Sequence, residues 1–242
     1  MTVDARGVGF AQLNERIRES KEENVNIVGC LGQRFIACGM SDKHVTIDGV
    51  PGNAMGAYLN GAEIFVNGNA QDAVGDTMNN GTIAVGGNIG DAAGYAMRGG
   101  EIYVKRNAGY RAGIHMKAYK EKKPVMVIGG RAGSFLGEYQ AGGYIVVLGI
   151  GIGEKPIVGN FPCTGMHGGK MFLRVKYGES GIDFPGQVTA KAATDEDKAE
   201  IRRFVKKYCE LFGEDADKIM ESDFTVVSPD SKNPYKQMYV AN

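Results

Sequence analysis

The chain has 242 residues with 28 basic and 28 acidic side chains, so its formal charge of zero gives no reason to expect binding to nucleic acid or to an anionic membrane. No run of 18 apolar residues is present, the N-terminus lacks the apolar core of a signal peptide, and the four cysteines form no CxxC pair. These features predict a cytoplasmic protein with reduced thiols. The 37 glycines are the unusual part of the composition, and they indicate many turns with positive φ.

Residues 1–24 predict an N-terminal helical cap. Phe10, Leu13 and Ile17 lie at helical spacing in a charged stretch, which is typical of an amphipathic helix. The repeat that follows would expose unpaired strands at its ends. We therefore expect this helix to cover the first turn of the repeat or to bind a partner.

Residues 25–178 form an internal repeat with a period of 19 residues, in which five columns recur in phase, two of them in the strands, such as Val45, Ile64, Ile83 and Ile102. The glycine column is Gly56, Gly75, Gly94, Gly113 and, after an insertion at 119–123, Gly137; the apolar column is Leu59, Met78, Met97 and Met116; the asparagine column is Asn69, Asn88 and Asn107. We expect the column glycines to share a backbone conformation that a Cβ would make costly.

Each repeat also contains a short strand with an apolar-x-apolar pattern, such as Ile64 to Val66 or Ile83 to Val85. Strands this short cannot bury themselves alone, but stacked copies can pair above and below. The sequence therefore predicts a mainly β fold, namely a right-handed parallel β-helix with about 19 residues per turn and flanking helical caps. The apolar column would be a buried core ladder, and the asparagines either a hydrogen-bonded ladder or independent turns.

Residues 179–242 predict a helix and an extended tail. An apolar stripe at helical spacing is formed by Ile201, Phe204, Val205, Tyr208 and Phe212. Thr194 and Asp197 could cap this helix, and Gly213 could end it. The segment from Phe224 to Val240 contains two prolines, which favours an extended tail.

Few residues suggest a catalytic or ligand-binding site. Cys163 and His167 are four residues apart and could form a nucleophilic pair, but Cys163 occupies the glycine column, which favours a structural corner. Gly149-x-Gly151-x-Gly153 lacks the spacing of a nucleotide-binding loop.

The acidic residues do not indicate a calcium-binding or catalytic site either. Asp72, Asp76 and Asp91 lie beside glycines but lack the nine-residue period of a calcium β-roll. Glu63 and Glu101 share one column with Lys170, which indicates an ordinary solvated face.

The repeat resembles the GXGXG domain at the C-terminal end of the glutamate synthase large subunit. Gly32-Gln33-Arg34-Phe35-Ile36-Ala37 is similar to the family's Gly-Gln-Ser-Phe-Gly-Ala motif, with Arg34 in place of Ser and Ile36 in place of Gly. Gly52-Asn53-Ala54-Met55-Gly56 through Val66 is similar to the family's turn-plus-strand unit. The resemblance covers residues 25–178, and it extends to one of the subunits of formylmethanofuran dehydrogenase, which has the same fold.

The resemblance implies a structural subunit without a catalytic site, cofactor or metal of its own. Such a subunit would hold a glutaminase subunit and an FMN and iron–sulfur synthase subunit together for glutamate biosynthesis. In agreement, Met1 and Thr2 stand where a glutaminase needs an N-terminal cysteine, and the four cysteines are too scattered for an iron–sulfur cluster. The candidate docking residues are Gly32, Gln33, Arg34 and Phe35 in the first turn, and Phe204 and Tyr208 in the C-terminal helix.

Two alternatives remain open at the level of the sequence. The first is a β-helix subunit of a formylmethanofuran dehydrogenase-like oxidoreductase. The second, from another class, is a free-standing carbohydrate-binding or hydrolytic β-helix, which would require paired carboxylates on one exposed column.

Overall fold

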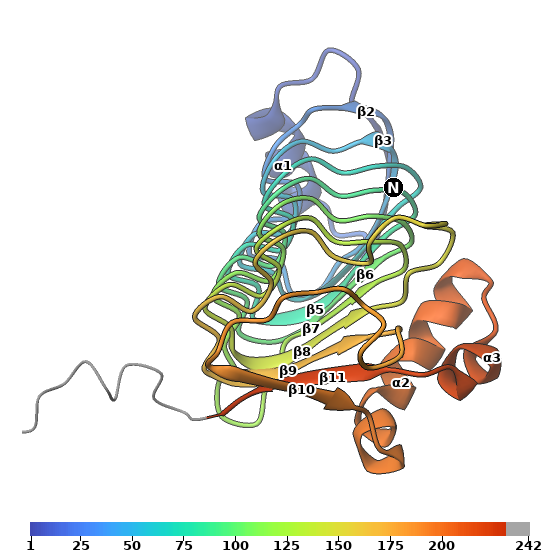
Figure 1. Ribbon diagram of the computed structural model, residues 1–242. Helices are drawn as coiled ribbons and strands as arrows, with labels where there is room; N and C mark the ends of the chain where they lie inside the picture. Colours follow the sequence, from blue (N-terminus) through green and yellow to red (C-terminus); the bar gives the residue numbers. More distant parts are fainter. Residues whose placement is uncertain (231–242) are drawn as a thin grey trace, which may run out of the picture.

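The computed structural model describes residues 1–230, which fold around one eleven-stranded sheet (Figure 1). The strands are β1 (Thr2–Asp4), β2 (Asn24–Leu31), β3 (His44–Val50), β4 (Asn60–Val66), β5 (Asn80–Val85), β6 (Glu101–Val104), β7 (Val125–Ile128), β8 (Ala141–Val147), β9 (Gly168–Leu173), β10 (Val188–Ala192) and β11 (Thr225–Pro229). The helices are α1 (Phe10–Glu19), α2 (Asp195–Phe212) and α3 (Ala216–Glu221). The prediction of a mainly β fold is confirmed.

Strands β1 to β9 lie side by side in chain order and are parallel, whereas β11 and β10 extend the sheet in antiparallel pairing. The register joins equivalent positions of the repeat, because Ile64 is opposite Ile83 and Ile83 is opposite Ile102. The loops between the strands stack as well (Figure 1). Their backbones are hydrogen-bonded from one loop to the next, as where Gly75 N–H donates to the Met55 carbonyl at 2.9 Å.

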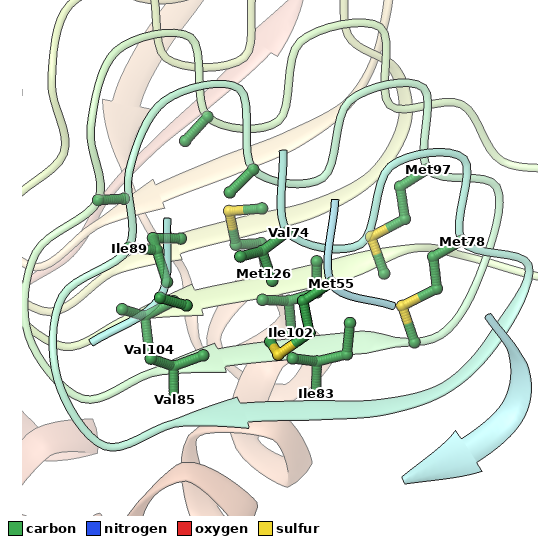
Figure 2. Packing of buried hydrophobic residues seen from close by; sticks show 14 of the residues in the cluster. Met55, Val74, Met78, Ile83, Val85, Ile89, Met97, Ile102, Val104 and Met126 are labelled. Carbon is green, nitrogen blue, oxygen red and sulfur yellow. The ribbon is translucent and has the colours of Figure 1, made fainter. Parts of the chain in front are cut away.

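The interior between the sheet and the stacked loops is apolar. Leu59, Met78, Met97 and Met116 are all fully buried in it. Figure 2 shows Met78 and Met97 projecting from successive loops into the same interior as Ile83 and Ile102. A thioether fits such a column because it is unbranched and adapts to small differences between neighbouring turns.

Helix α2 packs against the outer face of the sheet and does not cover an end of the repeat, which corrects the expectation of a C-terminal helical cap (Figure 1). Its contacts run across the strands: Tyr144 of β8 bonds Glu200 at 2.8 Å, and Lys207 bonds Glu101 of β6 at 2.7 Å. Phe204 lies between these contacts and is 2% exposed. The helix therefore closes a second apolar core on the side of the sheet away from the loops.

Both ends of α2 follow the predicted signals. Thr194 and Asp197 form a reciprocal capping box at its start, and Gly213 ends it with a left-handed φ of 75°. The column of Glu63, Glu101 and Lys170 is a solvated face only at Glu63, whose side chain is 58% exposed. Glu101 and Lys170 pair instead with Lys207 and Asp197 of α2.

The two ends of the repeat are closed differently. At the N-terminal end, Leu13 and Ile17 of α1 are fully buried, and the Asn14 amide donates to the Arg34 carbonyl at 3.1 Å. Strand β1 also pairs with β2, although the sequence predicts only a helix there.

At the C-terminal end the sheet continues through β11 and β10. Thr225, Val226 and Val227 are buried in β11, so the first part of the expected tail is a sheet strand. The rest of that segment, 231–240, lies outside the described residues. Within residues 1–230, no helix has the length and apolar character needed to cross a membrane.

Candidate interaction surface

The repeat turns place three residues with positive φ at alternate positions in each loop. In one loop these are Ala54, Gly56 and Tyr58, with φ of 61°, 67° and 56°; in the next they are Ala73, Gly75 and Thr77, with φ of 56°, 68° and 51°. All five glycines of the column have φ between 65° and 70°. The flanking residues adopt the same unfavourable region although most carry a side chain.

The middle position faces the core, which explains why it is glycine. A Cβ on Gly56 would lie 2.5 Å from Ile83 Cδ1, and one on Gly75 would lie 2.6 Å from Ile102 Cδ1. Gly94, Gly113 and Gly137 face Met126, Ile145 and Met171 at 2.6, 2.5 and 2.8 Å in the same way. Most of the flanking positions are at least partly exposed, so they tolerate large side chains such as that of Tyr58, which is 56% exposed.

These outward positions, together with their neighbours, carry two rows of aromatic rings that we together call the aromatic ridge: Tyr110, Phe135 and Phe161 in one row, and Tyr95, His115 and Tyr139 in the other. Phe135 lies 5.3 Å from Tyr110 and 5.2 Å from Phe161 between ring centroids. His115 stacks on Tyr139 at 5.0 Å, with the two planes 13° apart. The ridge therefore extends over several consecutive loops.

The ridge is both exposed and fixed in place. Phe161 is 61% exposed, and Tyr95 and Tyr110 are 41% and 38% exposed. The Arg111 guanidinium lies 4.9 Å from the Tyr110 ring centroid, and its Nε is 2.8 Å from the largely buried Glu138 carboxylate. A group of exposed rings held by a rigid backbone is typical of a surface that another protein covers.

Two polar ladders support the loops on which the ridge stands. In the first, the Asn69 side-chain oxygen accepts from Asn88 N at 2.8 Å, and that of Asn88 accepts from Asn107 N at 3.1 Å. The Asn107 side-chain oxygen accepts from Arg131 N at 2.9 Å, so the ladder continues from the turn before the insertion at 119–123 to the turn after it.

The second ladder was not predicted from the sequence. The Asp72 carboxylate accepts from Asp91 N at 2.8 Å, and that of Asp91 accepts from Tyr110 N at 2.7 Å. This ladder also explains why glycines stand next to it, because a Cβ on Gly90 would lie 2.0 Å from Asp72 Oδ1. The recurrence of Asp72 and Asp91 at the period of the repeat was the signal that could have revealed this ladder.

The docking residues predicted in the first turn differ in how far they are available to a partner. Gln33 is occupied internally, because its amide accepts from Leu31 N at 2.7 Å and donates to the Ala5 carbonyl at 2.8 Å. Gly32 has a φ of 81° and open space where a Cβ would be. Arg34 lies over the Phe10 ring at 5.1 Å, and Phe35 is 42% exposed at a centroid distance of 6.1 Å from the same ring.

Phe204 and Tyr208 are not open to a partner, which corrects the expectation for α2. They are 2% and 1% exposed, and the Tyr208 hydroxyl donates to the Lys105 carbonyl at 3.0 Å. Burial raises the pKa of Tyr208 above its usual value. Both rings fix α2 to the sheet of their own chain.

The possible nucleophilic pair has no reactive thiol. Cys163 is fully buried, and this burial raises the pKa of its thiol to about 12, so a thiolate is scarce near neutrality. Its Sγ contacts Met171 Sδ at 3.6 Å, and His167 Nδ1 bonds the Gly165 carbonyl at 3.0 Å. Among residues 1–230, no group of three or more His, Cys, Asp or Glu side chains is arranged to hold a metal ion.

A family model described as "GXGXG motif" matches residues 14–230. The chain belongs to the GXGXG motif family. This match confirms the resemblance that the repeat suggests. The positive φ values fall at every second position of a turn, which is the spacing of the glycines in the motif name.

Two relatives extend this finding. The chain is 42% identical over 252 residues to an uncharacterised protein of Methanocaldococcus jannaschii, and the alignment covers 99% of this chain and 96% of the relative. A chain of the formyltransferase/hydrolase complex of Methylorubrum extorquens, solved in complex with methylofuran, has a similar fold with a TM-score of 0.59. The match covers 93% of this chain and 89% of that chain at 17% sequence identity.

Proposed function

We propose that this GXGXG protein is a non-catalytic structural subunit of a glutamate synthase-type complex in the cytoplasm. Its stacked loops would form a right-handed parallel β-helix at residues 25–178, with residues 1–24 and 179–242 as flanking parts. The helix would hold a glutaminase subunit and an FMN and iron–sulfur synthase subunit in register. Such positioning matters because ammonia passed between two sites must not escape to water.

The aromatic ridge is the observation that carries this proposal. Its rings stand on a backbone that is hydrogen-bonded from loop to loop, so little conformational entropy is lost when a partner covers them. Burying a fully exposed Phe side chain contributes about 1.5–3 kcal/mol, and Phe161 is 61% exposed. The right hand of the helix is supported by the parallel pairing of consecutive strands, because such crossovers are right-handed in nearly all proteins.

A formyltransferase/hydrolase-type complex is the second candidate for the assembly. The specific observation in its favour is the fold shared with a chain of the Methylorubrum extorquens complex over 93% of the present chain. The two candidates require the same rigid, non-catalytic part and differ in the partner subunits.

The test is affinity purification of the tagged full chain from its native source, with mass spectrometry of the co-purifying subunits. Phe161→Ser removes a ring of the ridge that is 61% exposed, and Tyr177→Ser is the matched control because Tyr177 is 53% exposed and lies outside the ridge. We expect glutaminase and flavoprotein subunits with the wild type and with Tyr177→Ser, and their loss with Phe161→Ser. Recovery of formyltransferase and hydrolase subunits would select the second candidate, and stoichiometric recovery of neither set would overturn both.

A further inference from the structure

A cavity of about 560 Å³ lies where β8 and β9 begin, between the insertion at 119–123 and helix α2. Its lining includes Lys117, Lys123, Tyr144 and Glu200. This volume is typical of sites that bind small molecules. None of the residues that line the cavity belongs to the aromatic ridge, and the proposed scaffold role makes no use of the cavity.

The floor of the cavity is backbone because packing between loops excludes side chains there. It is formed by the pairs Gly142–Gly143 and Gly168–Gly169. A Cβ on Gly142 would lie 2.4 Å from Ala118 N, and one on Gly168 would lie 2.5 Å from the Ala141 carbonyl oxygen. The four glycines therefore leave a hollow into which they project no side chains, and the surface that lines the cavity is more apolar than polar.

The charges inside the cavity are neutralised by one another. Lys170 Nζ is 2.9 Å from Asp197 and also pairs with Glu200. Burial alone would lower the pKa of Lys170, but its hydrogen bonds to Glu200 and Asp197 raise it, so it stays protonated. Lys191 is a further partner of Asp197 at 3.6 Å, which leaves no excess negative charge in this group.

The lysines at the rim are not neutralised in this way. Lys117 and Lys123 are exposed and make no ion pair within residues 1–230. Lys123 Nζ lies 5.8 Å from the Tyr144 ring centroid, so its charge stands over the wall of the cavity. A concave, partly apolar site with excess charge of one sign concentrates ligands of the opposite sign.

We propose that this cavity binds a small anionic ligand, in which a carboxylate or phosphate meets Lys117 and Lys123 and a flat apolar group lies on the glycine floor. His167 adds a polar group beside the floor. Its Nδ1 donates to the Gly165 carbonyl, which leaves Nε2 as an acceptor in the neutral ring. The GXGXG protein would then carry a ligand site in addition to any role in assembly.

The experiment is titration of the purified full chain, with alanine methyl NMR signals as the readout. Ala118 and Ala141 line the cavity, whereas Ala54 and Ala73 lie in distant turns of the repeat and serve as internal references. One arm compares AMP with adenosine, which tests a phosphate. The other arm compares benzoate with benzamide, which tests a carboxylate.

We expect at least one anion to shift the Ala118 and Ala141 signals and to bind at least about tenfold more tightly than its neutral analogue. Lys123→Gln should weaken that binding by about fivefold to tenfold, because a charge-assisted contact is lost. Lys120→Gln is the matched control, since Lys120 is exposed in the same insertion but does not line the cavity, and its effect should stay below about twofold.

Three results would overturn the proposal: no shift with either anion up to about 10 mM, where even a Kd near 1 mM would be largely saturated; equal binding of the neutral analogues; or equal weakening by Lys120→Gln and Lys123→Gln. None of these results bears on the subunits recovered by affinity purification. Failure of the ligand site and failure of the scaffold role are therefore distinguishable.

Discussion

Substitution of Gly75 by alanine tests whether the glycine column is required by the core. Two costs are expected from the structure. The φ of 68° places an alanine in the left-handed region, which costs about 1 kcal/mol. The new Cβ would also lie 2.6 Å from Ile102 Cδ1 in a fully packed interior, and such overpacking costs about 1–3 kcal/mol. Gly75→Ala should therefore lower the free energy of unfolding by about 2–4 kcal/mol.

Gly39 provides the matched control for the backbone term. It has a φ of 71°, and no atom lies within 4 Å of the position that a Cβ would occupy. Gly39→Ala should therefore cost only about 1 kcal/mol. The difference between the two variants isolates the contact with Ile102.

A double-mutant cycle measures that contact directly. Ile102→Val removes the Cδ1 atom and alone costs about 1 kcal/mol. Because the clash is then gone, the double variant Gly75→Ala/Ile102→Val should be more stable than the sum of the single changes predicts, by about 1 kcal/mol or more. The measurement is urea denaturation of all four proteins. If Gly75→Ala costs no more than Gly39→Ala and the cycle shows no coupling, the steric account of the glycine column is wrong.

Three further predictions follow from burial and hydrogen bonding. Met97→Asp should lower the free energy of unfolding by more than about 4 kcal/mol, whereas Met97→Leu should cost less than about 1.5 kcal/mol; thermal melts of Met97→Asp close to wild type would contradict the core ladder. Asn88→Ala removes the acceptor of Asn107 N–H and should cost about 1–2 kcal/mol in the same denaturation assay, and an unchanged midpoint would show that the ladder adds no stability. Burial raises the pKa of Cys163 from 9.0 to about 12, so the native state retains a proton that the unfolded state releases in this range. The associated stability is fully present below pH 9 and decreases as the pH rises towards 12, and Cys163→Ala should reduce that slope.

The repeat could be predicted from the sequence because every turn solves the same packing problem. Val45, Ile64, Ile83 and Ile102 recur at one period, and the sheet register pairs these residues with one another. Glycine in a repeating column predicts a shared backbone conformation because few other residues adopt positive φ without cost.

The position of α2 on the sheet was not predicted, although the strands carry a signal for it. The middle residue of the apolar-x-apolar pattern is Ala84, Tyr103, Val127, Val146 and Phe172 in five strands, and all five are buried under the helix. Strands that are buried on both faces read as continuous apolar runs. Because only the strand positions that face the core were considered, the outer face of the sheet was interpreted as solvated.

The aromatic ridge could not be predicted from the local conformational preferences of its residues either. Phe135 and Tyr139 have φ of 58° and 54°, which is rare for bulky residues. Hydrogen bonds between loops hold them there, since Phe135 N donates to the Asn160 carbonyl at 2.8 Å and Tyr139 N donates to the Thr164 carbonyl at 2.8 Å. Tertiary pairing therefore overrides the local preference, and the outward rings follow from it.

Reconstitution tests the central claim most directly. The purified chain is mixed with the glutaminase and flavin subunits that the proposal names as its partners, and glutamine-dependent formation of glutamate from 2-oxoglutarate is measured with and without the chain. The scaffold account predicts no turnover by the chain alone, a high rate for the complete mixture, and a lower rate with less assembly when the chain is omitted. An unchanged rate and unchanged assembly without the chain would contradict the account, as would turnover by the chain alone.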